Sequence, residues 1–422
     1  MSNESHCNYD LVVIGAGVSG LSLAAALPDL SILILEAEDR VGGRVYSRQL
    51  CDVAVELGAI FPLMQDDTKS LDNSSYSAPV ALYQGGLLFP GSDPIEVLKG
   101  FSDSRTSAGI QGAHPMHSSE QFYDDLLKIL RLSETDAVLQ ATELYRLTDA
   151  FHRVIHPGPL SLYSQTFARQ ALTHWPCEFN EIPNHAFVDS ILARLSDRVV
   201  IRTGCKVTRL VANDGSFELD ATDSAGTFHI GARHGAITTP VRQLLHILRD
   251  SPRPVPDFYR NIVYVPGMVC AVVFEDIQPL PRYVVSADQL WSSMIPMHRG
   301  GRFILNFYLT DSWATKLWIE SDESIVGLLL RSVREMGVEA QCLGFVVQRW
   351  PELGPILSDN LVSHYSPGHY QLSPRLWYAG EMALYKPAMP MAYGVNAAVR
   401  AGELVASEIN ETVISSSGLT GD

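Results

Sequence analysis

A glycine-rich turn near the start of this 422-residue chain lies between an apolar strand and an alanine- and leucine-rich helix. Residues 9–14 (YDLVVI) have the β-branched content of a buried parallel strand, and GAGVSG follows at once. Residues 21–27 are typical of a helix that Pro28 ends, and residues 31–35 (SILIL) of a second strand. This order predicts a Rossmann-like α/β unit that binds a dinucleotide.

Each glycine of the motif has its own physical role. Gly15 permits the tight turn, Gly17 lets the backbone approach a pyrophosphate, and Gly20 lets the helix pack close to the strand. The unpaired N–H groups at the start of the helix attract phosphate. Glu36, directly after the second strand, is placed to accept a hydrogen bond from a ribose hydroxyl. The motif alone does not separate NAD from FAD.

The segments that follow Glu36 distinguish between NAD and FAD, because they resemble those of a known protein family. After Glu36 the chain continues EAEDRVGGRVYS and then, after a short turn, VELGA. This combination resembles the flavin amine oxidase family and its relatives, the protoporphyrinogen oxidases, phytoene desaturases and L-amino-acid oxidases. The resemblance implies a loop that crosses the FAD pyrophosphate and approaches the flavin, and a segment that lies beside the isoalloxazine ring. Carried over by position, the first comprises Arg40, Gly42, Gly43 and Arg44, and the second Glu56 to Ala59, with Gly58 between them.

Two later segments resemble the same family. Residues 198–210 (RVVIRTGCKVTRL) are similar to the strand whose backbone contacts the adenine, with Val207 at its centre. Residues 376–381 (LWYAGE), and the helix expected over 394–406, are similar to the carboxy-terminal FAD segment. The resemblance implies that Gly380 and Glu381 hold the ribityl chain, and that the backbone near Val395 faces the pyrimidine edge of the flavin. A positive helix end there stabilises an anionic reduced flavin.

These matches predict an α/β fold in which two domains alternate along the chain. A Rossmann-like FAD-binding domain of the glutathione-reductase type is expected from residues 1–62, 185–240 and 370–422. The expected α+β substrate-binding domain is interleaved with it, over residues 63–184 and 241–369. Within the second domain, residue spacing predicts helices over 120–132, 133–156 and 324–336, and strands over 263–274 and 303–309.

Charge and cysteine content exclude other function classes. The net charge of −16 argues against a nucleic-acid partner and against an anionic membrane surface. No apolar run approaches the roughly 18–20 residues of a membrane span. The six cysteines form no C-x-x-C pair, which favours a reduced, cytoplasmic setting. No metal site is expected, because His152 and His156, four residues apart on a predicted helix, lack a third ligand.

The chain departs from the family in three places. No cysteine follows Cys342, so the resemblance implies FAD held without a covalent bond. The strand that carries a lysine near flavin N5 in many family oxidases has Val269 or Cys270 in that place, which argues against rapid reaction with oxygen. Phe61 stands where L-amino-acid oxidases place an arginine for the substrate carboxylate. Alternative partners for a carboxylate are Arg299, Arg302 and Arg349.

The resemblance implies hydride removal from a C–H bond next to nitrogen to flavin N5, which converts an amine, amino acid or amide to an imine. The departures favour a specialised small-molecule metabolite as substrate and leave O2 or another electron acceptor open. Two alternatives remain, a C–C desaturase of the protoporphyrinogen oxidase or phytoene desaturase type and a flavin-binding partner protein without catalysis. A homodimer is compatible with the sequence. The residues expected beside the flavin, from position only, are Glu56, Phe61, Tyr385 and Tyr393.

Overall fold

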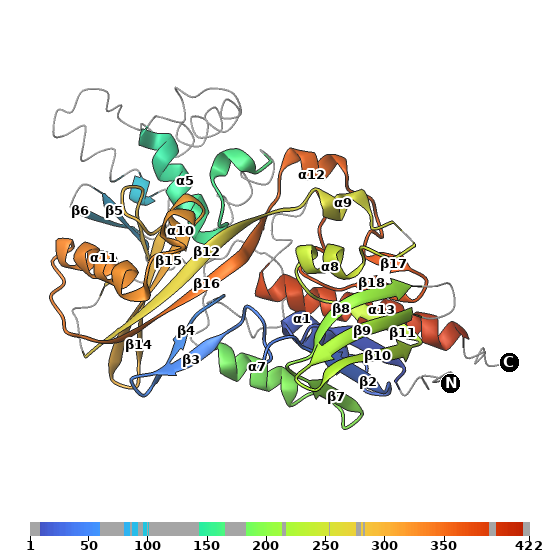
Figure 1. The fold of residues 1–422 in the computed structure, drawn as a ribbon. Helices are drawn as coiled ribbons and strands as arrows, with labels where there is room; N and C mark the ends of the chain where they lie inside the picture. Colours follow the sequence, from blue (N-terminus) through green and yellow to red (C-terminus); the bar gives the residue numbers. More distant parts are fainter. Residues whose placement is uncertain are drawn as a thin grey trace.

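The structure is a computed structural model in which two large β-sheets lie in separate parts of the molecule (Figure 1). The sheet nearer the two termini is built from strands within residues 11–35, 199–237 and 371–378, and the other from strands within 80–91 and 263–356. The residues that the structure describes are 9–59, 80–84, 87–91, 96–98, 100, 143–164, 183–212, 217–252, 254–275, 280–281, 283–387 and 394–416.

The first sheet has the predicted Rossmann-like order around the glycine motif. Its central strand pairs in parallel with one strand from the expected βαβ unit and with another from residues 234–237. Its first two strands are fully buried, as their apolar sequences predict. The strand order is β17 (Gln371–Ser373), β18 (Leu376–Tyr378), β11 (His234–Ile237), β1 (Leu11–Ile14), β2 (Ile32–Leu35) and β7 (Val199–Arg202).

Helices cover one face of this sheet and a small antiparallel sheet covers the other. Leu11, Val13 and the same face of β2 pack on helices α1, α7 and α13, of which α1 and α13 lie side by side. Val12 and Ile14 face the small sheet. The helices are α1 (Val18–Ala25), α7 (Asn184–Leu192) and α13 (Val395–Ser416), and the strands β8 (Lys206–Ala212), β9 (Phe217–Asp223) and β10 (Gly226–Ala232).

Two boundaries differ from the sequence-based predictions. Helix α1 begins at Val18, three residues before the predicted start, because Gly17 is its N-cap and Gly20 lies within its first turn. The prediction of a single strand over residues 198–210 is wrong. The segment forms two strands, β7 and β8, in different sheets, because Gly204 adopts a left-handed φ of 65° and redirects the chain between them.

The second sheet has seven strands among the described residues. The predicted strand 263–274 is confirmed as one of its central members, and the strand predicted over 303–309 extends one residue further at each end. The strand order is β16 (Cys342–Ile356), β12 (Val263–Phe274), β15 (Arg302–Thr310), β14 (Ser293–Arg299), β13 (Tyr283–Val285), β5 (Val80–Gln84) and β6 (Leu87–Gly91).

The two faces of the second sheet have different neighbours. One packs on α11 (Asp322–Glu335), which begins where the Ser321 hydroxyl caps Ser324 N and ends before Gly337, whose φ is +78°. The other packs on a hairpin, β3 (Ser47–Leu50) and β4 (Val53–Glu56). This hairpin follows the Rossmann-like unit directly in sequence, so it carries the chain from one sheet to the other.

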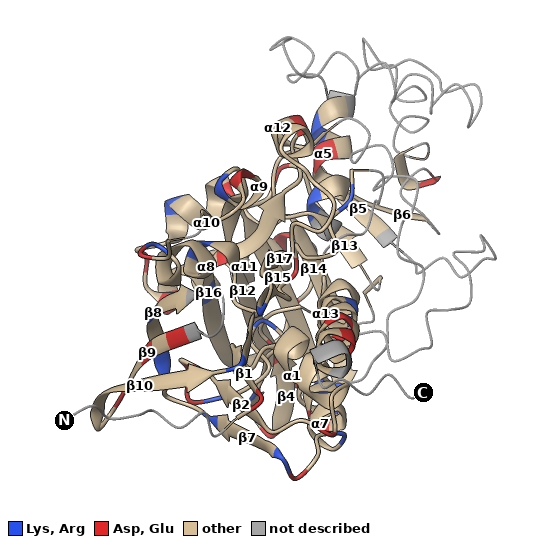
Figure 2. Cartoon of the chain, turned by 90° about the vertical axis from the view of Figure 1, so that its right-hand side faces the viewer, with Lys and Arg blue, Asp and Glu red and all other residues tan. Residues whose placement is uncertain are grey.

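Shorter elements complete the described part of the fold. Helix α5 is the described part of the helix predicted over 133–156, whereas the one predicted over 120–132 lies outside the described residues. Among the described helices, none combines the length and apolar character needed to cross a bilayer. Acidic and basic residues are interspersed over the described elements (Figure 2). The remaining elements are α5 (Glu143–Ile155), the 3₁₀ turn η1 (Leu160–Leu162), α8 (Val241–Ile247), α9 (Asp257–Arg260), α10 (Ser312–Leu317) and α12 (Asp359–Ser363).

Candidate functional site

The turn between β1 and α1 is closed at two of its glycines and open at the third. Gly15 has a left-handed φ of 107°, and a Cβ at Gly20 would lie 2.2 Å from the Gly15 carbonyl oxygen. A Cβ at Gly17 would meet no described atom within 4 Å. Gly17 is also the N-cap of α1 and has no side chain, so the first amides of the helix receive no side-chain cap. A phosphate can therefore approach the turn at Gly17 and at the helix N-terminus.

Glu36 is held against this turn by backbone donors. Its Oε2 atom accepts a hydrogen bond from Ala16 N at 2.7 Å, and its Oε1 atom accepts one from Glu38 N at 2.9 Å. The residue is half-buried at the carboxyl end of β2. The carboxylate thus lies where a ribose attached to the phosphates could reach it.

The loop after β2 crosses the same turn. Gly42 forms an isolated parallel bridge with Gly17 and donates from its amide to the Ala16 carbonyl at 2.8 Å. A Cβ at Gly43 would lie 3.2 Å from the Cα of Gly17. The Arg40 side chain bonds the Gly43 carbonyl at 2.8 Å. The RxGGR segment and the glycine motif are therefore adjacent, as the resemblance implies.

Arg44 connects this loop to the carboxy-terminal segment. Its Nη2 atom lies 2.6 Å from Glu381 Oε2, while the Tyr264 hydroxyl donates to Glu381 Oε1 at 2.6 Å. Burial by itself lowers the pKa of Arg44, but Glu381 and Tyr264 outweigh it, and the pKa is raised. The pKa of Tyr264 is raised well above its ordinary value by burial and then by Glu381. Sequence reasoning missed Tyr264, because nothing local distinguishes a tyrosine at the start of a strand.

The carboxy-terminal segment packs tightly on the first helix. The Ser19 hydroxyl donates to the Ala379 carbonyl, and a Cβ at Gly402 of α13 would lie 2.3 Å from the Ser19 carbonyl oxygen. Gly380 directly follows Ala379, and Val395, the first residue of α13, lies in the same apolar cluster as Ala16 and Val18. Val207 lies on β8, paired with Ala221 in the small sheet that faces β1 and β2.

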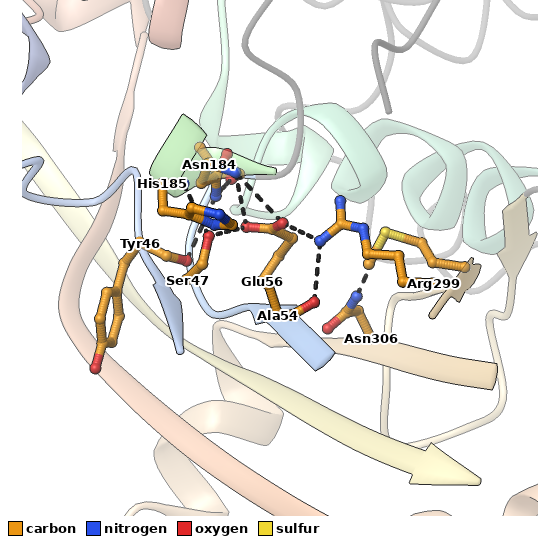
Figure 3. Close-up of polar contacts among 10 residues, drawn as sticks. Tyr46, Ser47, Ala54, Glu56, Asn184, His185, Arg299 and Asn306 are labelled. Atoms are coloured by element: carbon orange, nitrogen blue, oxygen red, sulfur yellow. Dashed lines mark hydrogen bonds and ion pairs between the residues drawn. The ribbon is translucent and has the colours of Figure 1, made fainter. Parts of the chain in front are cut away.

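Glu56 is occupied by protein partners (Figure 3). It is 1% exposed and forms an ion pair with Arg299 on β14. The Oε2 atom of Glu56 accepts a hydrogen bond from the Ser47 hydroxyl at 2.8 Å. The backbone N–H of Asn184 donates to both carboxylate oxygens of Glu56, at 3.3–3.4 Å. The Arg299 guanidinium also donates to the Ala54 carbonyl at 3.0 Å. This arrangement suits a positioning role for Glu56, and it removes Arg299 from the candidates for a substrate carboxylate.

The other aromatic candidates are not gathered at the site within the described residues. Phe61 and Tyr393 lie outside them. Tyr385 is 3% exposed, and its ring lies 5.3 Å from that of Phe258 and 5.8 Å from that of Tyr365. Burial raises the pKa of Tyr385 to about 12. These contacts are those of a core aromatic cluster between α9 and α12.

The side chains of β12 alternate between two faces of the sheet, which separates Val269 from Cys270. Cys270 lies in the cluster that packs on α11, whereas Ala271 and Val273 pack against the β3–β4 hairpin. Since side chains alternate along a strand, Val269 belongs to the hairpin face. There it pairs with Tyr308 and Gln348. Val269 and Cys270 thus lie on opposite faces of the second sheet.

The histidines have structural surroundings. His152 and His156 are each 1% exposed, with ring centroids 4.9 Å apart, and His152 contacts the Tyr163 ring at 4.6 Å. Burial lowers the pKa of both, that of His152 to about 3. The described part of the chain contains no cluster of three potential metal ligands. His364 is exposed and contacts the Asn360 carbonyl at 2.8 Å.

Comparison with known proteins finds sequence similarity chiefly in the amino-terminal part of the chain. A family model described as an NAD(P)-binding Rossmann-like domain matches residues 13–69. Flavin-containing amine oxidase B of Mus musculus is 45% identical over 64 residues, which cover 14% of this chain and 12% of that protein. Polyamine oxidase 1 of Zea mays is 28% identical over 160 residues, covering 33% of this chain and 32% of that protein.

Solved structures match over nearly the whole chain. Cyclohexylamine oxidase from Brevibacterium oxydans superimposes with a TM-score of 0.69 at 14% identity, covering 96% of this chain and 99% of that one. A putative protoporphyrinogen oxidase from Exiguobacterium superimposes with a TM-score of 0.64 at 16% identity, covering 95% and 98%. The expected α/β fold class and the resemblance to flavin amine oxidases are thus confirmed.

Proposed function

We propose that this chain binds FAD without a covalent bond and removes hydride from a C–H bond next to nitrogen in a small amine, amino acid or amide. One observation carries the proposal. Segments assigned to FAD from opposite ends of the sequence converge on the glycine motif, and the Arg44–Glu381 ion pair joins them. The similarity of the amino-terminal segment to amine oxidases that their names describe as flavin-containing supports the same cofactor.

The residues around the motif fit FAD chemically. The pyrophosphate would be held by the amides at the start of α1 and by the guanidinium groups of Arg40 and Arg44. Glu36 would accept from a ribose hydroxyl, and Glu381 from the ribityl chain. No cysteine follows Cys342 in the sequence, which supports non-covalent attachment.

The chain itself would mainly orient the substrate and exclude water. When bound, the flavin supplies a hydride acceptor at N5, and the substrate leaves as an imine that water can hydrolyse. Ala271 on β12 and Leu57 after β4 are fully buried in one apolar cluster, which keeps water out of this region and fixes the position of the chain after β4. An amine that arrives neutral needs little further acid or base catalysis.

If oxygen is the electron acceptor, we expect the protein to react with it slowly. All twelve residues of β12 are described, and none is a lysine. Oxygen or another acceptor would then return the flavin to its oxidised state.

Cys51, Cys205, Cys270 and Cys342 are free thiols, which supports a reduced, cytoplasmic setting. The proposal keeps the discontinuous FAD-binding and substrate-binding domains set out from the sequence, and a homodimer as the assembly to test.

A panel of substrates tests this reaction. The FAD-loaded protein is mixed without oxygen with amines, amino acids, amides and polyenes, and its visible absorption is followed. Bleaching by a nitrogen compound, with formation of an aldehyde or ketone after hydrolysis, is the expected result. Bleaching by polyenes alone would favour C–C desaturation, a second candidate that the fold of the Exiguobacterium structure supports. A yellow protein that nothing bleaches would favour a flavin-binding partner without catalysis.

A further inference from the structure

Three consecutive backbone carbonyls after β4 each accept a hydrogen bond from a buried or partly buried side chain. Trp350 Nε1 donates to the Leu57 carbonyl at 2.7 Å, and the Tyr308 hydroxyl donates to the Gly58 carbonyl at 2.6 Å. Asn184 Nδ2 donates to the Ala59 carbonyl. The donors come from β16, β15 and the first residue of α7. Two strands of the second sheet and a helix that covers the first sheet therefore meet at one short stretch of chain.

These donors are suited to hold a backbone rather than to react. Asn184 and Trp350 are 0% and 9% exposed. Burial, and then Glu56, raises the pKa of Tyr308 well above its ordinary value, so its phenol stays a proton donor. A buried carbonyl that loses such a donor keeps the cost of its desolvation, so each contact restricts the orientation of one peptide plane.

The amides of the same stretch are restricted too, with one exception. Leu57 N donates to the Tyr46 carbonyl at 2.8 Å, and Ala59 N donates to the Arg44 carbonyl at 2.9 Å. The N–H of Gly58, itself buried, donates to no described residue. A Cβ at Gly58 would lie 1.9 Å from the Arg44 carbonyl oxygen, so a side chain cannot be accommodated there. The backbone is thus held on its carbonyl side and at both flanking amides, while the Gly58 amide has no acceptor among the described residues.

We propose that Trp350, Tyr308 and Asn184 form a carbonyl clamp that sets the peptide planes of residues 57–59 and aims the Gly58 amide at the flavin ring. The inference rests on the proposed FAD site. The three donors are positioning residues, because they act through the backbone and not on the substrate. An N–H held against the ring stabilises the reduced flavin, which carries more negative charge than the oxidised form.

The neighbouring ion pair between Glu56 and Arg299 holds the start of the same stretch. Glu56 precedes the three carbonyls, and its contacts with Arg299, Ser47 and the Asn184 amide hold the start of the stretch. Asn184 joins the two groups, since its backbone contacts Glu56 while its side chain bonds the Ala59 carbonyl.

The sharpest test removes one hydroxyl from the full-length protein. Tyr308→Phe eliminates the donor to Gly58 and keeps the ring, while Tyr259→Phe is the matched control, since the Tyr259 hydroxyl also donates to a buried backbone carbonyl, that of His369, at 3.2 Å. For each protein we would measure FAD affinity, the visible flavin spectrum and the flavin midpoint potential. In Tyr308→Phe we expect FAD binding weakened about tenfold, the loss of one hydrogen bond of ordinary strength, with a shifted spectrum and a lower potential. Tyr259→Phe should match the wild type in all three.

Two results would overturn the proposal in different ways. A yellow wild type together with a Tyr308→Phe variant of unchanged affinity, spectrum and potential would refute the clamp alone. A wild type that takes up no FAD would refute both the clamp and the proposed function. Should Tyr308→Phe fail to fold, Trp350→Phe repeats the test with Trp291→Phe as its control, because Trp291 Nε1 donates to Ser332 at 2.9 Å on the opposite face of the sheet.

Discussion

Arg44 Nη2 lies 2.6 Å from Glu381 Oε2, and this ion pair joins the loop after β2 to the segment before α13. The Glu381 side chain is 6% exposed and that of Arg44 is 28% exposed. Arg44 also donates to the carbonyls of Glu352 and Leu353 at the end of β16. One guanidinium therefore connects three segments that are distant in sequence and that border the proposed cofactor site.

The ion pair predicts that Glu381→Gln is costly. The substitution leaves the Arg44 charge in a largely buried position without its partner, which typically costs about 3 kcal/mol. We expect a loss of roughly this size in the free energy of unfolding of the protein without cofactor, and weaker FAD binding. Glu403→Gln, at an exposed position on α13, is the control. Equal denaturant midpoints for the two variants would contradict the account.

The glycine motif predicts opposite effects at Gly17 and Gly20. Gly17 has an ordinary φ of −67° and open space at its Cβ position, so Gly17→Ala should fold normally but lose most of its FAD affinity. Gly20→Ala should unfold or fail to accumulate, because its Cβ would lie 2.2 Å from backbone. Gly327→Ala, exposed in α11, should gain about 0.5–1 kcal/mol and bind FAD normally. Fluorescence titration measures the FAD affinity of each variant, and thermal unfolding measures its stability. Normal FAD binding by Gly17→Ala would place the phosphate elsewhere.

Much of the FAD-assigned region could be predicted because its geometry is local. Gly15, Gly20 and Glu36 occupy their positions through turn and strand patterns that span only a few residues. The division of residues 198–210 into two strands could not be seen in a continuous β-branched pattern. It depends on the left-handed conformation of Gly204, which a glycine permits but does not require.

The contacts between distant elements were beyond the sequence. The resemblance of residues 56–59 marked Glu56 as a candidate, but its partner Arg299 lies on β14. Likewise, Tyr264 and Tyr308 reach the site only through the register and packing of β12 and β15. No spacing rule along the chain specifies such pairings, since they follow from how the second sheet packs on residues 56–58 and on the segment that contains Glu381.

A double-mutant cycle tests whether Glu56 acts with Arg299. Breaking a buried ion pair leaves one charge unpaired, so Glu56→Gln and Arg299→Met should each cost about 3 kcal/mol, and the double variant clearly less than their sum. Arg349→Met is the comparison, because Arg349 pairs with Asp322 instead. Its effect should add to that of Glu56→Gln. Strict additivity in the Glu56–Arg299 cycle would rule out the coupling.

The buried histidines predict a loss of stability in mild acid. His152 in the unfolded chain takes up a proton near its ordinary pKa of about 6.5. In the folded protein burial keeps it neutral until about pH 3. Protonation thus favours the unfolded chain, and the free energy of unfolding falls as the pH drops through this window. In His152→Phe this fall should be smaller, whereas exposed His364→Gln should follow the wild type. Identical pH profiles for His152→Phe and wild type would contradict a buried neutral His152.

The most direct test of the central claim is FAD uptake by the purified chain. The protein is incubated with FAD, passed through a gel-filtration column and then precipitated with acid. The account predicts a flavin absorption spectrum that stays with the protein on the column and moves to the supernatant in acid. Flavin retained in the acid pellet would contradict the non-covalent attachment, and a colourless protein after the column would contradict FAD binding itself.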